Sequence, residues 1–151
     1  MVKVLFVCLG NICRSPMAEF VLKDLVGKKN MKDLFIIESA ATSSEEVGNE
    51  MHIGTKRKLI EEKIPYERRV ARKIELDDYK KYDYIIGMDE SNIVNMKRIF
   101  KQDNENKIYK LLDFSEYSRD IADPWYTGNF DQTYDDVVEG CNGFLKFVMG
   151  N

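Results

Sequence analysis

The residues best suited to chemistry lie together in the segment Cys8-Leu9-Gly10-Asn11-Ile12-Cys13-Arg14-Ser15. This segment follows an apolar run and precedes a helix-like pattern, so its successive backbone amides can curl into a concave nest. A helix N-terminus adds partial positive charge there, and Gly10 and Asn11 tolerate the positive φ values that a tight loop needs. The loop is therefore predicted to bind a tetrahedral oxyanion such as phosphate, through Leu9, Gly10, Asn11, Ile12, Cys13 and Ser15.

Two side chains of this loop are predicted to act on a phosphoryl group directly. Arg14 offers a planar fork of N–H donors that can clamp two equatorial oxygens, which a lysine could not reproduce. Cys8 is predicted to be the nucleophile, because the helix end, the loop amides and the Ser15 hydroxyl favour thiolate over thiol. A cysteine that ends a strand can also be inert core, but the strand, loop and helix start together favour the catalytic interpretation.

Phosphoryl transfer also needs a proton for the leaving oxygen, and the candidate donor is Asp123 in Asp123-Pro124-Trp125-Tyr126. Asp-Pro is an ordinary turn former, yet this segment follows the last predicted strand and shares the rim of the sheet with Cys8. Asp123 is predicted to donate a proton in the first step and to accept one from water in the second. Trp125 and Tyr126 are predicted to line a crevice deep enough for an aromatic ring, which favours phosphotyrosine.

Apolar runs that are typical of strands alternate with helix-like segments along the chain. The predicted strands cover residues 2–7, 34–37, 82–87 and 108–112, and the predicted helices cover residues 16–27, 55–63, 89–100 and 134–149. Ser15 is expected to cap the first helix, with Pro16 at its first position. The alternation predicts an α/β fold with helices on both faces of a parallel sheet and a ligand crevice at the carboxyl ends of the strands.

Length and composition fit one soluble domain, predicted to span residues 1–151. Hydrophobic residues at 44% and charged residues at 32% are ordinary for a globular protein, and no apolar stretch reaches the length of a membrane span. A net charge of -3 without a basic stripe argues against nucleic acid as a partner. An anionic substrate must therefore be attracted by local positive charge, because the overall field mildly repels it.

The cysteines and the N-terminal residues indicate the cellular compartment in which the protein is expected. Cys8, Cys13 and Cys141 are odd in number, with two close together, and so do not resemble a disulfide framework. The N-terminus lacks the charged region and cleavage site of a signal peptide, so a cytoplasmic protein is expected. Two interpretations of Cys13 stay open: it pairs reversibly with Cys8 under oxidation, or it simply packs in the loop.

The segment from Val7 to Glu19 resembles the signature of the low-molecular-weight protein tyrosine phosphatases, and further resemblance spans nearly the whole chain. It appears in Glu38-Ser39-Ala40-Ala41-Thr42-Ser43, Ala71-Arg72, Met88-Asp89-Glu90-Ser91-Asn92 and Asp123-Pro124-Trp125-Tyr126. The resemblance implies a flavodoxin-like three-layer fold with a four-stranded parallel sheet, a cysteinyl-phosphate intermediate and neither metal nor other cofactor. It also implies that Ser15 stabilises the thiolate and that Asn11 and Asn92 hold the loop through hydrogen bonds. Phosphotyrosine-containing proteins or peptides are then the expected partners, inorganic phosphate the product, and a monomer or weak dimer the expected state.

Three positions depart from the family pattern. Glu45 stands where relatives often have a tryptophan on the pocket wall, Trp125 replaces a more usual tyrosine, and Arg69 replaces a frequent histidine. These departures concern substrate preference more than chemistry. Glu45 is expected to contribute to substrate binding and to disfavour acidic residues beside phosphotyrosine.

Other functions remain as alternatives. A related branch hydrolyses phosphoarginine and typically has threonine at the position of Ile12, so the isoleucine favours phosphotyrosine. A non-catalytic phosphotyrosine-binding module would need neither the thiolate nor the acid.

Arsenate reductases need two further cysteines, whereas only Cys141 lies outside the loop, in a predicted helix core. The loop also lacks the Gly-Lys-Ser/Thr ending of nucleotide sites and the ligand spacing of zinc sites, and the single histidine, His52, is expected to be a loop residue.

Overall fold

The strand that delivers Cys8 lies inside a four-stranded parallel sheet. The computed structural model describes residues 1–150, and its sheet has the order β2-β1-β3-β4 with every neighbouring pair parallel. The strands are β1 Val2–Cys8, β2 Phe35–Ala41, β3 Tyr84–Gly87 and β4 Ile108–Lys110. This is the flavodoxin-like order, in which a ligand crevice forms where the chain reverses direction across the sheet, here between β1 and β3.

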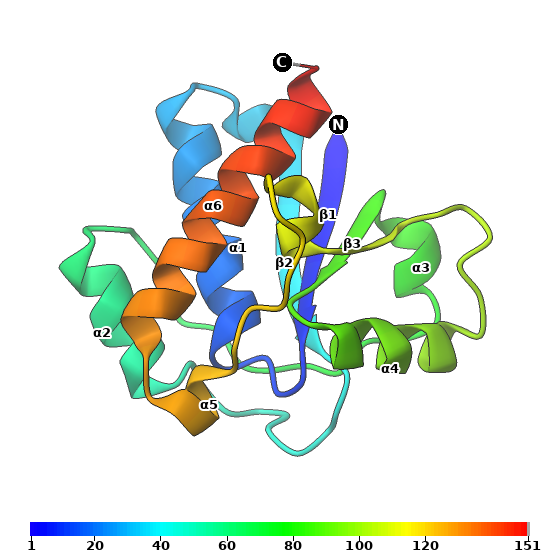
Figure 1. Ribbon diagram of the computed structural model, residues 1–151, viewed down its shortest axis with the longest axis horizontal. Coiled ribbons are helices and arrows are strands. Elements are labelled where there is room, and N and C mark those ends of the chain that lie inside the picture. The colour runs from blue at the N-terminus through cyan, green and yellow to red at the C-terminus, as the bar shows by residue number, and fades with distance from the viewer. Residues whose placement is uncertain (151) are drawn as a thin grey trace.

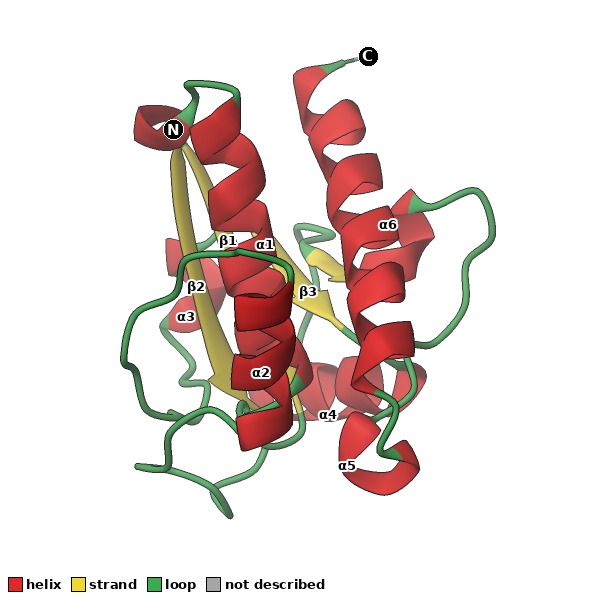
Figure 2. Ribbon diagram, turned by 90° about the vertical axis from the view of Figure 1, so that its left-hand side faces the viewer, coloured by secondary structure: helices red, strands yellow, loops and turns green. Residues whose placement is uncertain are grey.

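Helices cover both faces of the sheet, which confirms the predicted three-layer α/β fold. In Figure 1, α1, α2 and α6 lie on one side of the strands and α3 and α4 lie on the other. Figure 2 shows α1 and α6 running next to each other over the first face. The helices are α1 Arg14–Lys28, α2 Ile53–Glu61, α3 Asp78–Lys81, α4 Glu90–Phe100, α5 Pro124–Thr127 and α6 Phe130–Met149, with 3-10 turns η1 Lys32–Leu34 and η2 Leu111–Phe114.

The apolar run of β1 supplies both halves of the core. Val4 and Phe6 pack into the cluster beneath α1 and α6, whereas Leu5 and Val7 pack into the cluster beneath α3 and α4. All four side chains are fully buried. A central parallel strand covered on both faces needs this unbroken apolar sequence, so β1 is fixed tightly and ends at a well-defined point.

The predicted fourth strand, residues 108–112, is too long. β4 ends at Lys110, and Leu111 begins η2. Leu111 packs against α6 where Gly140 leaves space, since a Cβ on that glycine would lie 2.4 Å from Leu111 Cγ. The apolar residues that resemble a strand end therefore turn into the helix layer to fill this contact.

Several other helices and strands begin or end at different residues from those predicted. The predicted helix 134–149 begins earlier, at Phe130, because the Asn129 side chain accepts a hydrogen bond from the Gln132 amide at 3.0 Å. The predicted strand 82–87 begins later, because Tyr82 ends the short helix α3, which has no apolar periodicity to reveal it. β2 extends to Ala41, since its polar residues still pair with β1 along the full strand.

None of the helices between residues 1 and 150 combines the length and apolar character that crossing a bilayer requires.

The contact between α6 and η2 gives a test of this packing. Gly143→Ala should lower the free energy of unfolding by about 1–3 kcal/mol, as overpacking does, because its Cβ would lie 2.1 Å from the Phe114 carbonyl oxygen. Gly27→Ala is the matched control, since nothing lies within 4 Å of a Cβ there, and it should raise stability by about 0.5–1 kcal/mol. Urea unfolding followed by far-UV circular dichroism measures both, and equal effects would contradict the packing described.

Candidate active site

The segment from Cys8 to Ser15, here called the phosphate loop, is held from outside through its carbonyl groups. The amides of Thr42 and Ser43 donate to the carbonyls of Cys8 and Leu9, both at 3.0 Å. On the other side, the loop carbonyls of Ile12 and Cys13 accept hydrogen bonds from the His52 amide at 2.9 Å and the Thr55 hydroxyl at 3.1 Å.

These outward bonds leave amides inside the loop free. In the described part of the chain, the amides of Gly10, Ile12 and Cys13 donate to no protein acceptor. Free amides that converge on a concave loop at a helix start form an anion-binding nest. The loop can therefore surround an oxyanion, as the sequence predicts.

The tight turn of the phosphate loop is made by Asn11 alone. Asn11 has φ 59°, in the left-handed region, whereas Gly10 does not have a positive φ, contrary to the prediction that both would serve this purpose. Gly10 instead lets the side chain of Glu46 approach the loop closely, because a Cβ there would lie 3.3 Å from Glu46 Cγ. Asparagine accepts the left-handed conformation more readily than most residues, and its side chain fixes it here.

Beneath the loop, the side chain of Asn11 is saturated with hydrogen bonds. Its Nδ2 donates to Ser15 Oγ at 2.7 Å and to Ser39 Oγ at 3.0 Å, and its Oδ1 accepts from the Arg69 guanidinium and the Arg72 amide. Asn11 is completely buried and lies behind the loop instead of on the pocket wall. It therefore holds the loop shape, while the amides on the opposite side remain available to a ligand.

The thiol of Cys8 lies on the floor of the loop. Its Sγ accepts hydrogen bonds from the Asn11 amide at 3.2 Å and the Ser15 amide at 3.4 Å, and lies 3.0 Å from Ser15 Oγ. Donors directed at sulfur stabilise negative charge on it. The hydroxyl of Ser15 is thus engaged by Cys8 and Asn11. The expected capping role is wrong, because α1 begins at Arg14 and its cap residue, Cys13, makes no side-chain cap bond.

The other two cysteines have different environments. Burial, with the nearby charges of Cys8 and Asp123, raises the pKa of Cys13 to about 12, so its thiol keeps its proton at neutral pH. Cys141 is completely buried in α6, and burial raises its pKa as well. All three are free thiols. Cys8 differs from both in its set of hydrogen-bond donors.

Arg14 is 2% exposed and is oriented by three groups from outside the phosphate loop. Its Nη1 donates to Asp89 Oδ2 at 2.7 Å and to the Ile121 carbonyl at 2.8 Å, and its Nη2 lies 3.5 Å from Asp123 Oδ2. Burial opposes the charge of Arg14, but the charge of Cys8 and the bond to Asp89 outweigh it and raise the pKa. With both hydrogens of Nη1 engaged, the edge formed by Nε and Nη2 remains for a bidentate contact with an oxyanion.

Asp89 is a site residue that the sequence reasoning missed. It follows β3 and caps α4, with its Oδ1 accepting from the Asn92 amide at 2.8 Å, while its Oδ2 pairs with Arg14. Burial alone would raise the pKa of Asp89, but the hydrogen bond and charge of Arg14 hold it below its ordinary value. The available signal was a carboxylate two residues after β3, at the same edge of the sheet as the loop that follows β1 and carries Arg14.

Among the described residues, Asn92 is hydrogen-bonded at the start of α4, and no hydrogen bond joins it to the phosphate loop. Its Oδ1 accepts from the amides of Met88 at 2.9 Å and Asp89 at 3.2 Å, which completes a capping box at the start of α4. Asn92 is completely buried. Asn92 therefore fixes the backbone of Asp89, the residue that pairs with Arg14.

Asp123 lies at the start of the short helix α5, which the sequence treated as loop. Its Oδ1 accepts from the Trp125 amide at 3.0 Å, and Pro124 occupies the first turn. Its Oδ2 is left to face Arg14 across the pocket. The cap and the proline together fix one carboxylate oxygen and direct the other towards the floor of the site.

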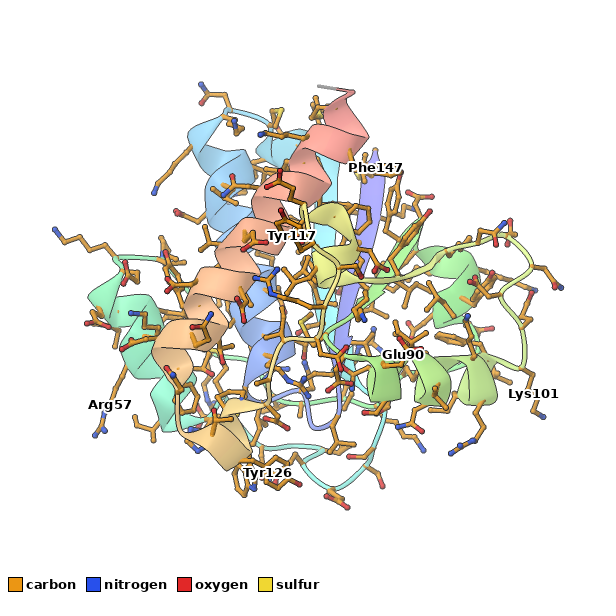
Figure 3. The ribbon with its side chains drawn as sticks, viewed as in Figure 1. Arg57, Glu90, Lys101, Tyr117, Tyr126 and Phe147 are labelled. Atoms are coloured by element: carbon orange, nitrogen blue, oxygen red, sulfur yellow. The ribbon has the colours of Figure 1, made fainter. Side chains whose placement is uncertain are left out.

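One pocket, enclosing about 120 Å³, brings the predicted residues together. Its lining includes Cys8, Leu9, Gly10, Ile12, Cys13, Arg14, Glu45, Asp123, Trp125 and Tyr126. Asn11, Ser15 and Asn92 are fully buried behind it. Figure 3 shows Tyr126 on α5 at the end of the molecule where the carboxyl ends of the strands lie. No group of three His, Cys, Asp or Glu side chains placed to bind a metal ion occurs in residues 1–150.

His52 lies in the loop before α2, as expected, and connects the pocket wall to the phosphate loop. Its ring stacks on Phe130 with centroids 5.2 Å apart and meets the edge of Trp125 at 5.6 Å. Its Nδ1 accepts from the Gly54 amide at 2.9 Å and so caps α2. The partners of His52 are distant in sequence, so no local pattern could have revealed this role.

The ion pair of Asp89 predicts a pH-dependent stability difference. Asp89→Asn retains a capping side chain but removes the charge, and should lower the free energy of unfolding at pH 7 by about 1–3 kcal/mol. The folded-state pKa of Asp89 is depressed, so its contribution is complete above pH of about 4 and is lost as pH falls through the folded value. Urea unfolding of both proteins between pH 7 and pH 3 should show the difference shrinking towards acid. A difference that grows towards acid would contradict the assignment.

Trp125 is the single tryptophan of the chain, so its fluorescence reports on the contact with His52. His52→Asn keeps an acceptor for the cap of α2 but removes the ring, and should shift the emission of Trp125 to longer wavelength as it gains exposure. Phe147→Leu is the control, because Figure 3 places Phe147 at the opposite end of the molecule from Tyr126, and it should leave the emission unchanged. An unshifted spectrum in His52→Asn would show that the ring does not support Trp125.

Comparison with known proteins extends these observations to the whole chain. The family model described as low molecular weight phosphotyrosine protein phosphatase matches residues 3–151. Among similar proteins, the low molecular weight protein-tyrosine-phosphatase YfkJ of Bacillus subtilis is 41% identical, over 99% of this chain and 97% of its own.

Solved structures of similar proteins have the same fold as this chain. The crystal structure of YfkJ superposes with a TM-score of 0.96 at 39% identity, covering 99% of this chain and 96% of that one. A low molecular weight protein tyrosine phosphatase from Streptococcus pyogenes gives 0.89 at 43% identity, covering 99% and 94%. A drosophila arginine phosphatase gives 0.89 at 33% identity, covering 97% and 98%. With the phosphate loop, the sheet order and the matched length in agreement, the chain belongs to the low molecular weight phosphotyrosine protein phosphatase family.

Proposed function

We propose that this protein hydrolyses phosphotyrosine in proteins or peptides through a cysteinyl-phosphate intermediate. One observation carries the proposal: the Cys8 sulfur, the free loop amides, the open edge of Arg14 and the Asp123 carboxylate meet in one pocket. We also propose that residues 1–151 form one domain with this single site, and that the reaction uses no cofactor.

In the first step, the Cys8 thiolate attacks phosphorus, a P–S bond forms and the bond from phosphorus to the phenolic oxygen breaks. The free amides of the phosphate loop and the Nε and Nη2 edge of Arg14 hold the three non-bridging oxygens as their charge redistributes. Asp123 gives its proton to the leaving oxygen.

In the second step, the same carboxylate acts as the base. Asp123 takes a proton from water, the water oxygen attacks phosphorus, and the P–S bond breaks. The products are inorganic phosphate and the Cys8 thiolate, which is again held by the amides of Asn11 and Ser15 and by the Ser15 hydroxyl. Arg14 remains oriented throughout by Asp89 and the Ile121 carbonyl.

The walls of the pocket support an aromatic leaving group. Trp125 and Tyr126 flank the entrance, and Ile12, within the phosphate loop, offers an apolar surface to the pocket. A phenolic ring gains from such contacts, whereas the guanidinium group of phosphoarginine would bring N–H donors to a side chain without an acceptor.

Phosphoarginine remains the alternative substrate, because one similar structure is titled an arginine phosphatase. A binding module without catalysis is less well supported. Recognition alone gives no reason for the sulfur, the arginine and the carboxylate to converge on one point.

The test is hydrolysis of phosphotyrosine and phosphoarginine in the presence of a chelator. Cys8→Ser should be inactive, and Asp123→Ala should lower kcat by about 10²–10⁴-fold, the usual contribution of a positioned acid. The loss in Asp123→Ala should be smaller with p-nitrophenyl phosphate than with phenyl phosphate, since the better leaving group needs less protonation.

Asp135→Ala is the matched control, because Asp135 is exposed on α6 and lies outside the pocket; it should retain wild-type activity. Activity that survives Cys8→Ser would remove the proposed nucleophile. Preference for phosphoarginine would replace the substrate assignment, and binding without turnover of either compound would favour a recognition module.

A further inference from the structure

Two neighbouring carboxylates, Glu45 and Glu46, line the active-site pocket and are here called the acidic rim. Glu45 is exposed and Glu46 is half-buried. They lie on the segment that follows β2, next to the phosphate loop, where Gly10 leaves space for the side chain of Glu46. Any polypeptide that presents a phosphotyrosine to Cys8 must pass close to them.

The segment that carries the acidic rim is anchored at both ends. The Ser43 amide bonds the Leu9 carbonyl at 3.0 Å, and the Gly48 amide bonds the Ala71 carbonyl at 2.9 Å. Glu46 itself accepts a hydrogen bond from Asn49 Nδ2 at 2.7 Å. The Glu46 carboxylate is therefore held in place, and the backbone of Glu45 is held beside it.

The charge of the acidic rim is not neutralised by the protein. In the part of the chain that the structure describes, neither Glu45 nor Glu46 forms an ion pair, whereas Glu50 pairs with Lys56 and Arg68. Arg14 is the one cation that lines the pocket, and it is buried and paired with Asp89 and Asp123. The mouth of the pocket is therefore negative, although its floor binds an anion.

The opposite wall favours the same kind of neighbour. Trp125 is 56% exposed and Tyr126 is 78% exposed, so each ring offers an outer face to solvent at the pocket entrance. Aromatic faces attract Lys and Arg side chains through cation–π contacts, which are strongest with tryptophan. Two independent features, carboxylates on one wall and aromatic faces on the other, thus suit a cationic side chain beside the phosphotyrosine.

We propose that the acidic rim makes this enzyme selective for phosphotyrosine flanked by lysine or arginine. This proposal rests on the proposed function. A basic neighbour meets the carboxylates of Glu45 and Glu46, while an acidic neighbour is repelled by them. The preference acts beyond the phosphate loop, so it changes which peptide is bound and leaves the sequence of bond-making steps the same.

The test compares three phosphotyrosine peptides that differ only in having lysine, serine or glutamate on both sides. For each variant, the kcat/KM for a peptide is divided by the kcat/KM for p-nitrophenyl phosphate. This compound has no flanking residues, so the ratio removes any effect of the substitution on the phosphoryl-transfer steps. At low ionic strength the wild type should prefer the lysine peptide over the glutamate peptide by about 3- to 10-fold, the scale of a few exposed charge pairs. The preference should fall at about 0.15 M salt, where the Debye length is near 8 Å.

The variants assign this preference to the acidic rim. Glu45→Gln with Glu46→Gln should bring the ratio close to one, and Glu45→Lys should favour the glutamate peptide. Glu50→Gln, an acidic residue of the same segment outside the pocket, should keep the wild-type ratio. A wild-type ratio near one, or a ratio that persists in the double variant, overturns the proposal.

A binding measurement separates this proposal from the proposed function. Binding of the three peptides to Cys8→Ser, followed by Trp125 fluorescence, needs no turnover. If the wild type fails to hydrolyse any phosphotyrosine compound, the proposed function fails, yet tighter binding of the lysine peptide would still support the acidic rim. Equal binding of all three peptides overturns the selectivity whether or not the enzyme is active.

Discussion

The ion pair between Arg14 and Asp89 is the contact on which the site depends. A guanidinium that is 2% exposed would be strongly unfavourable without a partner, and Asp89 meets it at 2.7 Å. The pair joins the first turn of α1 to the cap of α4, two helices on opposite faces of the sheet. It also fixes which edge of Arg14 faces the pocket, because the Nη1 hydrogens are used by Asp89 and the Ile121 carbonyl. The same contact thus closes the fold around the strand ends and orients the cation for an anionic ligand.

A second constraint is the division of the phosphate loop into an outer and an inner side. Its carbonyls are engaged by Thr42, Ser43, His52 and Thr55, so its amides turn inward. Asn11 allows this geometry by adopting a left-handed conformation, with a side chain that is hydrogen-bonded beneath the loop. Because the loop begins at the end of β1, whose last five residues are buried, small displacements of Cys8 would disturb packing on both faces of the sheet.

The parts of the site that could be predicted from sequence are those carried by contiguous residues. The phosphate loop combines the proposed nucleophile, the turn residue and the arginine in eight positions, and the fold follows from the alternation of apolar strands with helices. Asp123 was accessible because it follows a strand and therefore lies at the same rim as Cys8. Asp89 and His52 were not recognised, because each works through partners distant in sequence: Arg14 for the first, and Trp125 and Phe130 for the second. The end of β4 was misjudged for a similar reason, since the contact of Leu111 with Gly140 decides it.

The contrast between floor and walls suggests how chemistry and substrate choice can vary separately in this fold. Residues beneath the floor of the pocket, such as Asn11, Ser15 and Asn92, are completely buried and hydrogen-bonded at the strand ends and helix starts, so a change there costs stability. Wall residues such as Glu45, Trp125 and Tyr126 are exposed, and their side chains have few partners. Substitution there removes little packing, and most surface changes alter stability by less than about 0.5 kcal/mol. The departures from the family pattern at positions 45 and 125 are on these walls, where a new charge or ring can redirect substrate binding without disturbing the buried pair that orients Arg14.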